Sequence, residues 1–120
     1  MHRRNAHKQG YNFSELINVL PALAAHANVN PVGRKTIDFA NPVSVKALNS
    51  ALLKHYYKVD YWDIPQGYLC PPVPGRADYI HAIADLIANT SKGSSQLKAR
   101  SSKGIVGLDI GTGANMIYPI

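Results

Sequence analysis

The strongest constraint on the fold lies at the end of the printed sequence. Ile105 to Ile110 form an apolar run of strand length, and Gly111-Thr112-Gly113 follows directly. Such a run predicts a buried strand, and two glycines separated by one residue predict a sharp turn that something approaches closely. Ligands of doubly wound α/β sheets bind where strands end. We therefore expect the first strand of such a sheet, with Asp109 beside the turn.

The spacing of the glycines limits which class of ligand the turn can bind. A dinucleotide fingerprint needs a third glycine three residues after Gly113, and Met116 stands there. S-adenosylmethionine has no pyrophosphate; it needs bare main chain beside its amino-acid and ribose portions and a carboxylate near its ammonium group. Gly111, Gly113 and Asp109 could supply these. The alternative is that the glycines only end a core strand.

Hydrophobic periodicity predicts several helices before this strand. Helical spacing runs from Phe13 to His26, where Pro21 predicts a break. Residues 42–57 are expected to form one helix, because Asn41-Pro42 is a favourable start and Val45, Leu48, Leu52 and Tyr56 share a face. A further helix is expected over residues 78–89.

The segments between these helices are expected to be shorter or irregular. Residues 28–35 are predicted to form a turn-rich connector and residues 36–39 a short strand. Residues 60–76 are rich in proline and glycine, so regular structure is not expected there. Residues 91–104 are rich in Ser and Lys, which predicts a mobile loop.

Arg76 is the second candidate for a ligand contact. It follows the stiff segment from Pro71 to Gly75 and precedes a predicted helix. An arginine held there could bind a ligand carboxylate through a pair of charged hydrogen bonds. The alternative is a surface ion pair with Asp78.

The basic charge is concentrated at the two ends of the chain. The formal net charge is +6 and the isoelectric point is about 9.6. Residues 1–35 hold Glu15 as their one acid, and residues 91–104 hold no acid. The basic residues of these two regions are Arg3, Arg4, Lys8, Arg34, Lys35, Lys92, Lys98, Arg100 and Lys103. This distribution favours a polyanionic partner, because neutralised phosphates release counterions.

Other residue types exclude several classes of protein. Cys70 is the single cysteine, so an internal disulfide is excluded and a cytoplasmic location is the simplest expectation. No apolar run approaches the roughly 20 residues that a membrane span needs. The five histidines have no metal-binding spacing. The aromatic residues Tyr56, Tyr57, Tyr61 and Trp62 are expected to pack in the core, with stacking on a base as the alternative.

Taken in order, several segments resemble one known family. They are His2-x-Arg4-Asn5, Ile37-Asp38-Phe39, Val45 to Asn49 with Leu52-Leu53, Trp62 to Pro65, Cys70 to His81 and Leu108 to Pro119. The chain resembles the family of the bacterial ribosomal RNA large subunit methyltransferase F, which methylates the exocyclic amine of one adenine in 23S ribosomal RNA. The eukaryotic methyltransferase-like protein sixteen, which acts on spliceosomal small nuclear RNA, looks like a more distant relative.

The resemblance implies roles for particular residues. Asp109, Gly111 and Gly113 would contact S-adenosylmethionine, and Arg76 would reach the carboxylate of this cofactor. Arg3, Arg4 and Lys8 would meet RNA phosphates, here those of 23S ribosomal RNA. Asn5 would either order this basic arm or contact the RNA itself. No catalytic residue and no metal ligand is expected among the 120 residues.

The resemblance also implies a domain organisation, and the sequence departs from the family pattern at one motif. We expect an α/β fold: a basic arm over residues 1–11, an α-rich region with a short β element over residues 12–90, a loop over residues 91–104, and the start of a Rossmann-like methyltransferase domain over residues 105–120. Such enzymes carry an Asn-Pro-Pro-Phe tetrapeptide after the glycine loop, and this sequence has none. We therefore expect the 120-residue chain alone to be inactive and its single core strand to be poorly supported. The competing function is a non-enzymatic RNA-binding module.

Overall fold

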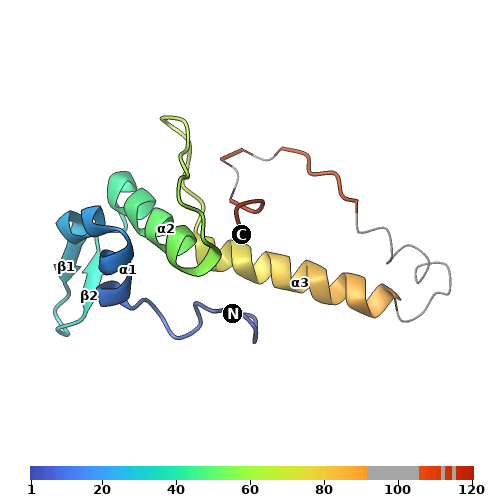
Figure 1. Ribbon diagram of the computed structural model, residues 1–120, viewed down its shortest axis with the longest axis horizontal. Coiled ribbons are helices and arrows are strands. Elements are labelled where there is room, and N and C mark those ends of the chain that lie inside the picture. Colours follow the sequence, from blue (N-terminus) through green and yellow to red (C-terminus); the bar gives the residue numbers. More distant parts are fainter. Residues whose placement is uncertain (92–105, 112, 115) are drawn as a thin grey trace.

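The computed structural model describes residues 1–91, 106–111, 113, 114 and 116–120. The chain begins with a docked arm and continues through helix α1 (Phe13–Val19), the 3₁₀-helix η1 (Pro21–His26), and strands β1 (Ala27–Val29) and β2 (Lys35–Ile37). Helices α2 (Pro42–Tyr57) and α3 (Val73–Ser91) follow. In Figure 1, α1 and the two strands lie at one end, α2 lies beside them, and α3 projects away from this body.

The break at Pro21 is confirmed. The side chain of Asn12 caps α1 by accepting from the Glu15 amide, and α1 ends at Val19. Pro21 has no amide hydrogen to continue the α-helical ladder, so the chain restarts at Pro21 as a separate 3₁₀-helix. Leu16 and Leu23, one from each helix, are both buried.

Residues expected to form only a connector instead form part of a hairpin. Strands β1 and β2 are antiparallel, with Ala27 opposite Ile37 and Val29 opposite Lys35. The Asn30 side-chain oxygen accepts from the amides of Val32 and Arg34 at 3.1 and 2.9 Å, which tightens the turn. This turn brings the residues on its two sides into pairing. Strand β2 therefore begins at Lys35, one residue before the predicted start, and its partner β1 was not predicted from periodicity.

Helix α2 has the bounds that the sequence predicts. Asn41 caps it by accepting from the Val43 amide at 2.9 Å, Pro42 occupies the first turn, and Lys58 ends it with a φ of 61°. The buried core residues are Phe13, Leu16, Leu23, Ile37, Leu48, Ala51, Leu52, Leu53, Val73 and Met116. Burying each leucine stabilises the fold by about 1.5–3 kcal/mol. Leu48, Ala51, Leu52 and Leu53 come from α2, so this helix supplies more of the core than any other element.

Helix α3 begins five residues before the predicted start at Asp78. Asn49, on α2, is 3% exposed, and its side-chain oxygen accepts from the Val73 amide at 3.2 Å. Pro74 has no amide hydrogen to satisfy, and the Arg76 amide donates to the Pro72 carbonyl at 3.2 Å. The first turn thus forms within the proline-rich segment because a neighbouring helix caps it.

The C-terminal segment is largely exposed. Val106, Leu108 and Ile110 are 95%, 87% and 86% exposed, and residues 106–111 form no strand in the part of the chain that the structure describes. The prediction of a buried strand over residues 105–110 is therefore wrong for the described residues 106–110, because an isolated strand has no partners for its main-chain groups. Met116, 1% exposed, returns the segment to the core. The loop was expected over residues 91–104; Ser91 is the last residue of α3, and residues 92–104 lie outside the described residues.

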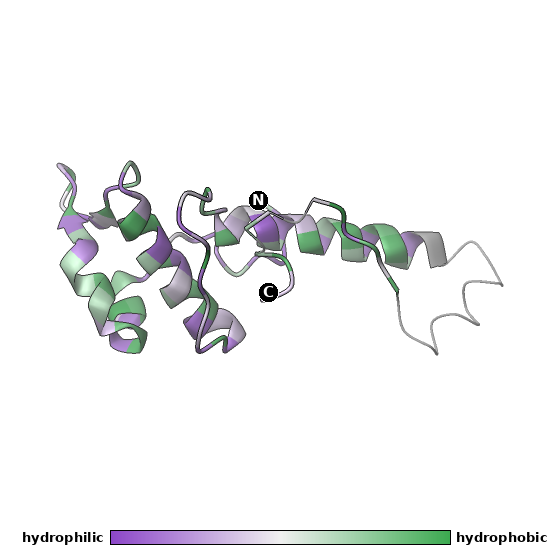
Figure 2. Ribbon diagram, turned by 90° about the horizontal axis from the view of Figure 1, so that it is seen from above, coloured by the Kyte–Doolittle hydropathy of each residue, from purple (hydrophilic) through white to green (hydrophobic). Residues whose placement is uncertain are grey.

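Helix α3 itself carries an exposed apolar side. Figure 2 shows hydrophobic and hydrophilic residues alternating around α3 along its length. Tyr79, Ile83 and Leu86, at helical spacing, are 50%, 38% and 67% exposed. Across all described helices, none is both long and apolar enough to cross a bilayer.

Candidate functional site

A hollow of about 540 Å³ lies between the proline-rich segment, the start of α3 and the C-terminal glycine loop. Figure 1 shows the C-terminal segment folding back toward the beginning of α3. The lining includes Arg76, Asp109, Gly111 and Gly113, the four residues predicted to bind a cofactor. Leu69, Pro71, Pro72, Tyr79, Ala114, Met116 and Ile117 complete it. The structure thus brings together residues that lie more than 30 positions apart in the sequence.

The glycine loop presents bare main chain to this hollow. Gly111 and Gly113 have φ angles of 74° and 54°, in the left-handed region that favours glycine. A Cβ atom built on either residue would meet nothing within 4 Å. A ligand can therefore approach the backbone closely at both positions.

Arg76 projects from the first turn of α3 and stays available for a ligand. The expected alternative was an ion pair with Asp78, but Asp78 instead accepts from His2 and Asn5. Among the described residues, Arg76 has no ion pair. The N-terminus of a helix also favours negative charge, so Arg76 and the helix act in the same direction. This side of the hollow is suited to a carboxylate.

Asp109 supplies the opposite charge, and Tyr118 holds it. Desolvation raises the pKa of Tyr118, and the charge of Asp109 and a hydrogen bond to it raise this pKa further. Tyr118 therefore remains a neutral phenol near neutral pH. Sequence reasoning missed Tyr118, although it lies only nine residues after Asp109. A ligand with both an ammonium and a carboxylate group matches the charges of this hollow.

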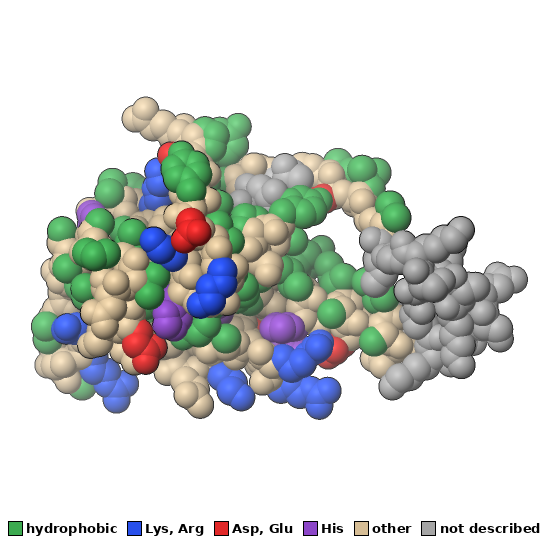
Figure 3. All heavy atoms as spheres, viewed as in Figure 1, with side chains coloured by type: hydrophobic (Ala, Val, Ile, Leu, Met, Phe, Trp, Pro, Cys, Tyr) green, Lys and Arg blue, Asp and Glu red, His purple; other side chains and the backbone are tan. Residues whose placement is uncertain are grey.

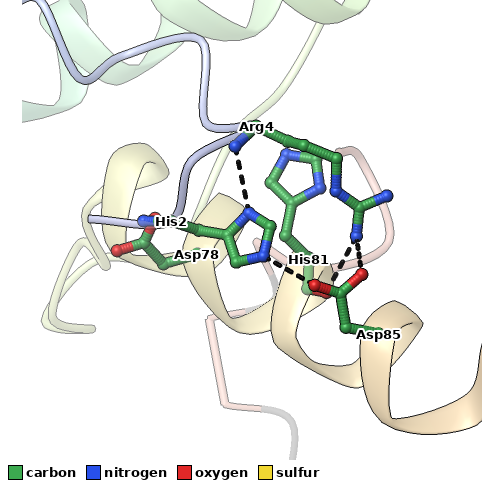
Figure 4. A network of polar contacts seen from close by, with 5 residues as sticks. All are labelled: His2, Arg4, Asp78, His81 and Asp85. Carbon is green, nitrogen blue, oxygen red and sulfur yellow. Dashed lines mark hydrogen bonds and ion pairs between the residues drawn. The ribbon is translucent and has the colours of Figure 1, made fainter. Parts of the chain in front are cut away.

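The N-terminal arm is docked on α3, as Figure 4 shows. The His2 ring nitrogen Nε2 lies 2.9 Å from Asp85 Oδ2, and the Arg4 guanidinium forms an ion pair with the same carboxylate. The His2 ring stacks on His81 with centroids 5.1 Å apart. The first residues are therefore not a free arm, because the acidic residues of α3 hold them.

The residues predicted to bind RNA differ in their exposure. Arg3 and Lys8 are exposed, and Arg4 is exposed although it is paired. Asn5 is 1% exposed, and its side chain makes its hydrogen bonds within the protein. These contacts suit the role in which Asn5 orders the arm.

A second hollow, of about 850 Å³, lies between the arm, α1 and the hairpin. Its lining includes Gln9 and Gly10 from the arm, and Arg34, Lys35 and Phe39 from the hairpin region. Phe39 is 58% exposed. The charge count had included Arg34 and Lys35 without assigning them to a site, although two adjacent cations after a tight turn were a usable signal. Figure 3 shows Lys and Arg side chains along the lower edge of the molecule.

The histidines and aromatic residues have mainly structural contacts. Tyr56, Tyr57 and Trp62 pack against the core, whereas Tyr61 is 82% exposed and does not. His7 is 2% exposed and its Nε2 lies 2.9 Å from the Tyr57 hydroxyl. The described residues contain no group of three potential metal ligands among His, Cys, Asp and Glu.

The fold and the first hollow define the class: an α/β protein in which an arginine, an aspartate and two glycines line one hollow. Residues 1–120 match a family described as RNA methyltransferase. The ribosomal RNA large subunit methyltransferases F of Flavobacterium johnsoniae and Shewanella pealeana are 53% and 55% identical to the chain over all 120 residues. The chain belongs to this RNA methyltransferase family, and it spans 37% and 31% of the length of these two relatives.

Solved structures of human METTL16 are also similar. Its N-terminal domain in complex with SAH is 36% identical, with a TM-score of 0.77 over 99% of this chain and 43% of that one. Its catalytic domain in complex with the MAT2A 3′UTR hairpin 6 is 37% identical, with a TM-score of 0.66 over 75% of this chain and 32% of that one. The resemblance drawn from the sequence is confirmed, and the chain shares the α/β fold of these domains.

Proposed function

We propose that this chain is the cofactor- and RNA-binding part of an S-adenosylmethionine-dependent methyltransferase that modifies the exocyclic amine of an adenine in 23S ribosomal RNA. The observation that carries the proposal is the convergence of Arg76, Asp109, Gly111 and Gly113 on one hollow. The names of the bacterial relatives support the ribosomal RNA methyltransferase activity, and the SAH complex of the METTL16 domain supports the cofactor.

The residues of the hollow fit the amino-acid and ribose portions of the cofactor. Arg76 would bind the carboxylate, Asp109 would attract the ammonium group, and the open main chain at Gly111 and Gly113 would leave room for the nucleoside. When bound, S-adenosylmethionine supplies a methyl group activated on a sulfonium. The protein contributes mainly orientation, because it fixes the cofactor relative to the incoming amine.

The basic residues would bind the RNA backbone. Arg3, Arg4 and Lys8 on the arm and Arg34 and Lys35 at the second hollow would neutralise phosphates. The exposed ring of Phe39 would offer a surface on which a base can stack. The target adenine would be unpaired or flipped, since its amine is otherwise engaged in pairing.

Isothermal titration calorimetry, which measures the affinity of the chain for S-adenosylhomocysteine, tests the proposal. We expect saturable binding by the chain, no binding of NADH, and a loss of about 10–100-fold in affinity for Arg76→Ala, the range expected for a charged hydrogen bond. Arg34→Ala is the matched control: it should leave this affinity unchanged but weaken salt-dependent binding of a 23S ribosomal RNA fragment. RNA binding without any cofactor binding would instead support the non-enzymatic module.

A further inference from the structure

Helix α3 has two faces with different contacts. Pro74, Asp78, His81 and Asp85 are spaced four, three and four residues apart, so they form one stripe along the helix. The N-terminal arm contacts each of these residues. Arg76 lies two residues after Pro74, roughly 200° around the helix at about 100° per residue, on the face toward the cofactor hollow.

Asn5 makes the buried contact between the arm and this turn. Its Nδ2 donates to the Pro74 carbonyl at 2.9 Å and to Asp78 Oδ1 at 2.5 Å. Its Oδ1 accepts from the His7 amide at 2.8 Å, which fixes the orientation of the side-chain amide. With 1% exposure and all these hydrogen bonds made, Asn5 has one defined position.

Asp78, one helical turn after Pro74, binds the first residues of the arm. The His2 amide donates to its Oδ1 at 2.7 Å, and the N-terminal ammonium group lies 3.9 Å from its Oδ2. The hydrogen bond from Asn5 is the largest cause of the lowered pKa of Asp78, followed by that from His2. The carboxylate is therefore charged near neutral pH and keeps the arm docked.

This turn depends on contacts from outside the helix. Pro71, Pro72 and Pro74 have no amide hydrogens, and first-turn amides have no partners within a helix. Asn49 caps the turn from α2, and Asn5 holds it from the arm. Without Asn5, the turn carrying Arg76 would lose its buried anchor on the face opposite the hollow, and helix ends with few contacts open readily.

We propose that Asn5 is a positioning residue for the cofactor pocket: by clamping Pro74 and Asp78, it fixes the direction in which Arg76 projects. The affinity for the cofactor then depends on a docked N-terminal arm, the same arm that carries Arg3, Arg4 and Lys8. This inference rests on the proposed function, since it concerns the same pocket.

A double-mutant cycle on S-adenosylhomocysteine binding tests the proposal. Asn5→Ala should weaken binding about tenfold in the wild-type background, but less than about twofold in an Arg76→Gln background, because it acts through Arg76. Asn12→Ala, which removes another capping amide far from the pocket, is the control and should leave the affinity unchanged. Affinities are compared at a temperature where every variant is folded.

The outcomes separate this inference from the proposed function. If the wild-type chain does not bind S-adenosylhomocysteine, the proposed function fails. If it binds, but Asn5→Ala binds equally well or loses as much affinity in the Arg76→Gln background, the positioning role is overturned and the proposed function stands. If Asn5→Ala does not fold, Asp78→Ala, at a side chain 34% exposed, replaces it in the same cycle with the same expected pattern.

Discussion

At the scale of single residues, His7 is the side chain whose burial has a measurable consequence. Burial lowers its pKa below the ordinary value of 6.5. Its Nδ1 has no hydrogen-bond partner within the described part of the chain. The rings of Tyr56 and Tyr57 face it, with centroids 4.6 and 5.9 Å from the His7 ring. His7 therefore binds a proton less readily in the folded protein than an exposed histidine does.

The stability of the chain should fall as the pH is lowered from 7 to 5. His7 takes up a proton more readily in the unfolded chain, with a pKa near 6.5, than in the folded one. Below about pH 6.5 the unfolded state therefore binds more protons than the folded state, so the free energy of unfolding decreases as the pH falls. Urea unfolding at several pH values measures this slope.

His7→Gln is the control for the pH slope, because glutamine does not titrate. The pKa values of Asp63, Asp78 and Asp85 are also lowered, from an ordinary value of 3.8. Protonation of these carboxylates therefore affects stability only at more acidic pH. An unchanged slope between pH 7 and 5 in His7→Gln would show that another group is responsible.

At the scale of elements, Asn49 joins α2 to the start of α3 and to the wall of the proposed cofactor pocket. Its Nδ2 donates to the Pro71 carbonyl at 3.1 Å and to Cys70 Sγ at 3.0 Å, and its Oδ1 accepts from the Val73 amide at 3.2 Å. Pro71 also lines the pocket. The start of α3 is thus set by α2.

Asn49→Ala should destabilise the protein by about 1–3 kcal/mol, because it leaves buried polar groups without partners. Urea unfolding measures this loss, and hydrogen exchange at the Val73 amide should become faster. Asn49→Asp keeps the acceptor for Val73 but loses the donor to Pro71, so its exchange rate should lie between the two. Equal exchange in all three proteins would contradict the capping role.

The elements with local signals were predicted well from the sequence. Asn41-Pro42 and the apolar spacing gave the bounds of α2, and Pro21 gave the break before η1. The start of α3 was missed because its cap, Asn49, comes from another helix. Strand β1 was missed because three residues with only partial burial show no alternating pattern.

At the scale of the whole molecule, the proposed cofactor pocket is assembled from segments far apart in the sequence. The sequence indicated Arg76 and the glycine loop separately, and the structure places both around one hollow. The sequence did not indicate that the basic arm docks on the back of α3, because that contact depends on a buried asparagine and on two carboxylates far along the chain. Basic charge alone predicted a partner for this arm, not its position.

The most direct test of the account is where S-adenosylhomocysteine contacts the chain, measured by amide chemical shifts in nuclear magnetic resonance titration. The account predicts that the largest saturable shifts fall on Arg76, Asp109, Gly111 and Gly113, with the hairpin amides of Arg34 and Lys35 unchanged. Shifts confined to the hairpin and the second hollow, or no shifts at saturating ligand, would contradict it.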